Sequence, residues 1–177
     1  MTTNSLFDSE MTFGPYPEGH FFHIEKTYKD HSMEQDTKMA EFLLIRADDE
    51  QSPMVWVVEA KQSAPNPKNP ENPLKFVEFI DKIREKMTNG LTLGIAICLL
   101  RHEFAKTELP DLFQKLDLSK TKFQFILVIK GHEKSWLVPL QEELTNVLRP
   151  TAKLWALPAI PVVVMNDLMA RNYGLIA

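Results

Sequence analysis

Glu59 and Lys61 close an apolar run, Met54 to Lys61, whose β-branched and aromatic residues predict a strand. Because side chains alternate along a strand, Glu59 and Lys61 share one face while Val58 takes the other. Carboxylates bind hard divalent cations such as Mg²⁺ or Mn²⁺. A lysine beside such a site can orient a water or stabilise charge on a phosphate oxygen. The pattern therefore indicates metal-assisted hydrolysis of a phosphodiester.

A second acidic residue, Glu41, begins another predicted strand, which ends at Arg46 and is followed by the polar segment 47–53. If 47–53 is a turn, Arg46 lies opposite Met54, and counting outward places Glu41 opposite Glu59. Opposed side chains in such a hairpin have Cβ atoms about 4.5–5.5 Å apart, and like charges there are destabilising. A cation would compensate for this repulsion, so Glu41 and Glu59 are predicted metal ligands and catalytic residues, together with Lys61 as a catalytic residue.

A helix is expected to follow the irregular, proline- and asparagine-rich segment 62–72, because Pro73 suits its first position. Apolar residues then recur at steps of three and four. They are Leu74, Val77, Ile80, Ile83 and Met87. Residues 91–100 alternate large and small side chains, which fits a buried strand or a continuing helix. Helix is the preferred reading, because no proline separates this segment from the preceding one.

The rest of the chain alternates between predicted strands and helices. Strands are predicted at 123–130 and 162–165, a helix at 136–148, and a last helical turn capped by Asn166 or Asp167. Residues 20–27 fit the start of a strand or a short helix. Residues 1–19 are expected to form an irregular leader, and 20–177 a single α/β domain with a central mixed β-sheet flanked by helices.

Composition narrows the function classes. The 177 residues carry a net charge of −4, which argues against binding nucleic acid through bulk charge. The single cysteine, Cys98, excludes an internal disulfide and a zinc site built from cysteine pairs. The apolar run 91–100 is about half of a membrane span, and no secretory signal is recognised near the start, so a cytoplasmic protein is expected.

The arrangement of Glu41 and Glu59-Ala60-Lys61 before a long helix resembles the PD-(D/E)xK (restriction-endonuclease-like) nuclease superfamily, over residues 21–101. The resemblance implies a restriction-endonuclease-like core in which the two acids bind Mg²⁺ or Mn²⁺ and the lysine assists hydrolysis of nucleic acid, with DNA expected first. It also suggests Glu25 as an upstream metal ligand. The first half of the superfamily's motif is Pro-Asp, and this chain has Ala40-Glu41 at that place. The chain is also similar to small bacterial proteins of unassigned role that carry an Ile-Glu-Lys segment before such a hairpin.

Alternatives remain open at this point. The same fold also serves catalytically inactive binding or assembly modules, and a ligand-binding or sensor domain could share the hairpin. The pair His20 and His23 has metal-binding spacing but no third ligand nearby in the sequence. The basic residues on and near the expected helix fit a solvated face better than a phosphate-binding one; they are Lys68, Lys75, Lys82, Arg84 and Lys86. A homodimer is a further expectation, because a core of this size often needs a second copy to grip a duplex.

Overall fold

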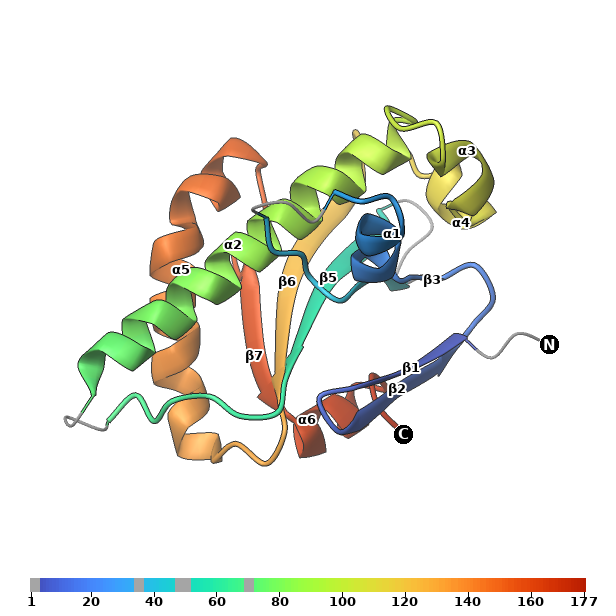
Figure 1. Ribbon diagram of the computed structural model, residues 1–177. Coiled ribbons are helices and arrows are strands. Elements are labelled where there is room, and N and C mark those ends of the chain that lie inside the picture. The colour runs from blue at the N-terminus through green and yellow to red at the C-terminus, as the bar shows by residue number, and fades with distance from the viewer. Residues whose placement is uncertain (1–3, 34–36, 47–51, 69–71) are drawn as a thin grey trace.

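A five-stranded mixed sheet forms the centre of the computed structural model, which describes residues 4–33, 37–46, 52–68 and 72–177 (Figure 1). Its strands follow the spatial order β3-β4-β5-β6-β7. They are β3 (Phe21–Phe22), β4 (Phe42–Arg46), β5 (Met54–Lys61), β6 (Lys122–Ile129) and β7 (Val162–Asn166). The α/β class and the mixed sheet are as the sequence predicts.

The structure confirms which two strands form the predicted hairpin and the register in which they pair. β4 and β5 are antiparallel, with Arg46 paired to Met54 and Phe42 to Val58. The backbone N–H of Glu41 donates to the carbonyl oxygen of Val58 at 3.0 Å, which carries the pairing one residue beyond β4. The predicted turn at 47–53 falls largely on residues 47–51, which lie outside the described part of the chain.

Two long helices make the crossovers between the parallel strands. Helix α2 (Pro73–Cys98) joins β5 to β6, and α5 (Lys134–Leu154) joins β6 to β7. The ambiguous segment 91–100 is therefore helical as far as Cys98, in agreement with the preferred reading. Figure 1 shows both helices lying across the sheet. The side chain of Asn72 caps α2 by accepting from the backbone N–H of Lys75 at 3.2 Å.

The two faces of the sheet bury separate apolar clusters. On β5, Val55 and Val57 belong to the cluster that includes residues of α2 and α5. Trp56 and Val58 belong to the cluster on the opposite face, with residues of β2 and the C-terminal segment. Because β5 alternates in this way, Glu59 and Lys61 fall on the helix-covered face. The site residues of β5 therefore point toward α2.

The predicted irregular leader at 1–19 is wrong for residues 4–16. They form a two-stranded antiparallel sheet, β1 (Asn4–Asp8) and β2 (Met11–Tyr16). Tertiary contacts hold this hairpin: Phe13 packs edge-on against Phe42 with ring centroids 5.3 Å apart. The Tyr16 hydroxyl donates to the carbonyl oxygen of Leu175 at 2.7 Å, so the hairpin closes the second apolar cluster beside the C-terminus.

Four shorter helices complete the described part of the chain. They are α1 (Ile24–Asp30), α3 (Ala105–Glu108), α4 (Asp111–Gln114) and α6 (Asp167–Asn172). Residues 20–27 thus combine a short strand with the start of a helix. The side chain of Asn166 caps α6, accepting from the Met169 N–H at 3.0 Å, as one of the two predicted caps. Among the described residues, no helix has the length and apolar character needed to cross a membrane.

Candidate active site

The structure brings Glu25, Glu41, Glu59 and Lys61 together in one cluster between the sheet and its helices. Glu41 directly precedes β4, Glu59 and Lys61 lie near the end of β5, and Glu25 lies in the first turn of α1. A backbone hydrogen bond from the Glu25 N–H to the carbonyl oxygen of Glu41, 3.2 Å long, fixes α1 against the start of β4. The residues selected from the sequence are therefore neighbours in space.

A lysine from α2 lies between the two opposed carboxylates. Lys86 Nζ is 2.9 Å from Glu59 Oε1 and 3.4 Å from Glu41 Oε1. Lys61 Nζ is 2.5 Å from the same Glu59 oxygen. Two ammonium groups therefore converge on Glu59, and one of them also bridges to Glu41. This arrangement offsets the repulsion expected between carboxylates on opposed strand positions.

Both carboxylates are buried, Glu59 completely and Glu41 with 4 % of its surface exposed. Their second oxygens, Glu41 Oε2 and Glu59 Oε2, have no hydrogen-bond partner among the described residues. A buried, unsatisfied carboxylate oxygen costs free energy unless a proton or a cation binds it. The cluster thus retains two oxygen atoms suited to a hard cation.

Burial changes the proton affinities of these groups. Burial, reinforced by the charge of Glu59, raises the pKa of Glu41 to about 8. Burial also raises the pKa of Glu59, while the ammonium groups of Lys61 and Lys86 oppose this shift. Burial acts to lower the pKa of Lys86, but Glu59 and Glu41 outweigh it, so its pKa is raised. Lys86 therefore remains an ammonium ion, and burial favours the protonated forms of Glu41 and Glu59.

Close packing of α2 on the sheet brings Lys86 to the carboxylates. A Cβ atom added at Gly90, one turn after Lys86, would lie 2.7 Å from Ala40 Cβ and 3.0 Å from Val57 Cγ1. Only glycine allows this approach without displacing neighbouring atoms. Because Ala40 precedes Glu41 in the chain, the contact sets the distance between the helix and the site.

A second group of possible ligands shares Glu41. One ligand atom from each of His23, Glu25 and Glu41 lies within 4.8 Å of the others. His23 is the N-cap residue of α1, but its side chain makes no capping hydrogen bond. Lys29 Nζ is 3.0 Å from Glu25 Oε2. Burial acts to raise the pKa of Glu25, but the ion pair with Lys29 outweighs burial, so this pKa is lowered. Burial lowers the pKa of His23, which favours the neutral imidazole that binds metals.

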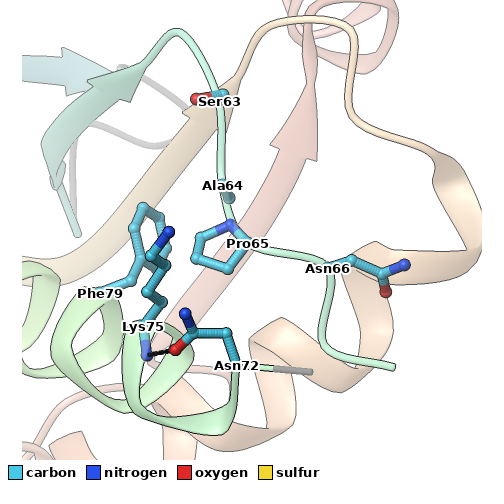
Figure 2. A pocket seen from close by; sticks show the side chains of 7 residues that line it. All are labelled: Ser63, Ala64, Pro65, Asn66, Asn72, Lys75 and Phe79. Carbon is cyan, nitrogen blue, oxygen red and sulfur yellow. Dashed lines mark hydrogen bonds between the residues drawn. The ribbon is translucent and has the colours of Figure 1, made fainter. Parts of the chain in front are cut away.

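A groove of about 620 Å³ lies where the chain leaves β5 and later enters α2 (Figure 2). Its lining comes from the segment directly after Lys61 and from the first turns of α2. The residues are Ser63, Ala64, Pro65, Asn66, Asn72, Lys75 and Phe79. Residues 63–66 and 72 thus border this groove, and residues 69–71 lie outside the described chain.

Sequence reasoning missed two residues of this cluster. Lys86 was placed among solvated lysines, but its side chain is only 15 % exposed. Its position next to Met87, at the border of the apolar stripe, is the signal that could have identified it. His23 lacked a third ligand in the sequence, and the structure places Glu25 and Glu41 beside it. His20 is not in the cluster, and its Nδ1 lies 3.2 Å from the Glu18 carbonyl oxygen.

No protein-family model, curated protein or solved structure matches this chain. The functional argument therefore depends on the geometry of the cluster itself.

Proposed function

We propose that this protein is a metal-dependent phosphodiester hydrolase acting on nucleic acid, with DNA as the first substrate to test. The observation that carries the proposal is the pair Glu41 and Glu59, buried on one face with their Oε2 atoms unpartnered. Buried oxygens without partners fit a divalent cation, because coordination to such an ion offsets the free-energy cost of removing these oxygens from water. Lys61 beside Glu59 supplies the positive charge that phosphoryl chemistry needs.

The fold supports the same proposal. A hairpin, a crossover helix and a parallel strand follow in the order expected for a restriction-endonuclease-like core. Glu41 directly precedes β4 and Glu59-Ala60-Lys61 ends β5, which agrees with what the resemblance to the PD-(D/E)xK superfamily implies. A shared architecture alone does not establish an activity, so the side-chain cluster carries the argument.

Each residue has a distinct role in this proposal. Glu41 and Glu59 would hold Mg²⁺ or Mn²⁺, and Glu25 would complete the ligand set. When bound, such an ion supplies a Lewis acid and a water of lowered pKa. Lys61, whose side chain is 29 % exposed, can reach a phosphate oxygen or orient the attacking water. Lys86 holds the Glu59 carboxylate in position from α2.

The groove lined by residues 63–66 and the first turns of α2 supports a path for the substrate. Asn66, Asn72 and Lys75 offer polar contacts of the kind that bind a sugar–phosphate backbone, and Phe79 offers an aromatic surface. A second copy of the chain would let two such sites act on both strands of a duplex, so a homodimer is part of the proposal.

The main alternative is a catalytically inactive member of the same fold, used as a binding or assembly module. The contacts of Lys61 and Lys86 with Glu59 favour it, because ammonium groups can neutralise buried carboxylates without any metal. The two functions differ in whether a cation can bind and whether bonds are cleaved.

A substrate survey tests the proposal. The wild type is incubated with supercoiled plasmid, linear duplex, single-stranded DNA and RNA, each with Mg²⁺, with Mn²⁺ and with a chelator. We expect cleavage of at least one nucleic acid that requires the metal and is lost in Glu59→Gln. Glu143→Gln, a change at an exposed residue of α5, serves as the control. If the wild type leaves all four substrates intact with both metals, the inactive alternative is favoured.

A further inference from the structure

The cation position between Glu41 and Glu59 already contains the ammonium group of Lys86. Lys86 Nζ lies 2.9 Å from Glu59 Oε1 and 3.4 Å from Glu41 Oε1. A metal ion at the same place would have to displace a buried lysine. On the other side of Glu41, toward α1, the ammonium group of Lys29 pairs with Glu25, with Nζ 3.0 Å from Oε2.

His23 and Glu25 lie on that side. One ligand atom of each lies within 4.8 Å of the other and of a Glu41 carboxylate oxygen. Metal–ligand bonds of about 2.1 Å separate donors by about 4.2 Å when they are opposite each other. Shifts of less than about an ångström would therefore let the three residues share one ion, and the remaining positions would hold water or substrate.

Glu41 itself gives an independent indication of a missing ligand. Its side chain is 6 % exposed, Oε1 faces Lys86, and Oε2 has no partner among the described residues. The side chain of His23 makes no capping hydrogen bond to α1, and its ring lies beside that of Phe21 with centroids 6.2 Å apart. Lys29, which pairs with Glu25, has a half-exposed side chain that can move into solvent when a cation binds.

We propose that His23, Glu25 and Glu41 bind one divalent transition-metal ion, and that the imidazole makes this site prefer Mn²⁺ over Mg²⁺. Imidazole suits transition-metal ions, whereas Mg²⁺ selects oxygen ligands and sheds its waters reluctantly. This assigns His23 a ligand role beside Glu25 and Glu41, so that the proposed metal site has mixed nitrogen and oxygen ligands. It deepens the proposed hydrolase function, on which it rests for its chemical purpose, but metal binding is measured without substrate.

Calorimetry with MnCl₂ and with MgCl₂ on the metal-free protein tests this site. We expect one Mn²⁺ to bind at least about tenfold more tightly than Mg²⁺. We also expect His23→Gln to weaken Mn²⁺ binding by at least about tenfold, because losing even a residue that only hydrogen-bonds to a metal ligand lowers metal affinity about 10–100-fold. Mg²⁺ binding should change little in His23→Gln. His20→Gln, a nearby histidine outside the cluster, is the matched control and should bind both ions as the wild type does.

A spectroscopic readout separates ligation from misfolding. Electron spin-echo spectra of the Mn²⁺ complex should show coupling to a histidine nitrogen in the wild type and in His20→Gln, and no such coupling in His23→Gln. His23→Asp should restore Mn²⁺ binding in part while narrowing the preference over Mg²⁺. Equal affinity of the wild type for the two ions, or nitrogen coupling retained in His23→Gln, overturns the proposal. Mn²⁺ binding through His23 without nucleic-acid cleavage would uphold this site and reject the hydrolase function.

Discussion

Lys86 on α2 and Glu59 on β5 form a buried ion pair, with Nζ 2.9 Å from Oε1. The contact joins the crossover helix to the strand that it covers. It is not isolated, because Lys61 contacts the same oxygen and Lys86 also reaches Glu41. The pair therefore contributes both to the stability of the fold and to the charge of the candidate site.

The first prediction concerns this pair. Lys86→Met keeps most of the buried stem and removes the ammonium group, leaving Glu59 with Lys61 alone. Breaking a buried pair completely costs about 3–5 kcal/mol. Because Lys61 remains, we expect a loss of about 1–3 kcal/mol in the free energy of unfolding. Urea denaturation in metal-free buffer measures it.

The matched control for that change is Lys82→Met, an exposed lysine one turn earlier on α2. It should change the free energy of unfolding by less than about 0.5 kcal/mol. Combining Lys86→Met with Glu59→Gln in a double-mutant cycle should give a coupling energy above about 0.5 kcal/mol. Additive effects would show that the contact contributes no stability.

The second prediction concerns pH. The pKa of Glu41 is raised from an ordinary value of 4.5 to about 8 in the folded protein. Between these values the folded state retains a proton that the unfolded state has lost, so this group lowers stability as pH rises. The stabilisation of the folded state by the protonated Glu41 carboxyl is complete below about pH 4.5 and is lost above about pH 8. Glu41→Gln cannot ionise and should not show this loss.

The experiment compares the wild type with Glu41→Gln by urea denaturation from pH 5 to 8.5 without metal. We expect the stability of the wild type to decline relative to the variant as pH increases. Since the histidines with lowered pKa values, His23 and His132, are present in both proteins, their opposite contribution largely cancels in the comparison. A constant difference between the two proteins across this range would refute the assignment.

The third prediction concerns the packing of α2. Gly90→Ala would place a Cβ atom 2.7 Å from Ala40 Cβ, and that atom cannot rotate away. Overpacking of this kind costs about 1–3 kcal/mol. Gly94→Ala meets the end of the flexible Leu43 side chain, Cδ1, at 2.9 Å. Both changes gain about the same helix propensity, about 1 kcal/mol.

Thermal unfolding of the two glycine variants should therefore show a lower melting temperature for Gly90→Ala than for Gly94→Ala. Equal melting temperatures would mean that the approach at Ala40 does not constrain the helix.

Much of this arrangement could be predicted from local patterns. The register of β4 and β5 follows from counting outward from Arg46 and Met54, and the alternation of β5 fixes the face of Glu59. The carboxylates therefore become neighbours by local geometry alone. The length of α2 was harder to predict, because large and small residues alternate over 91–98 as they would in a buried strand.

The features that were missed depend on contacts between distant segments. Residues 4–16 appear irregular because their strands are short and because Gly14-Pro15 falls in the second one, and they are held by Phe42 and by the C-terminal Leu175. Lys86 resembles its solvated neighbours until the close approach at Gly90 fixes α2 against the sheet. His23 comes close to the Glu41 carboxylate only because α1 packs beside the start of β4.

The most direct test of the proposed hydrolase is the cleavage rate of Lys61→Ala on plasmid DNA at saturating Mn²⁺, with metal binding measured on the same sample. Removing a group that stabilises transition-state charge costs about 10²–10³ in rate. We predict a loss of that order with Mn²⁺ affinity retained, and an unchanged rate in the control Lys82→Ala. A wild type that leaves the DNA intact, or a Lys61→Ala variant that cleaves it as fast as the wild type, would contradict the account.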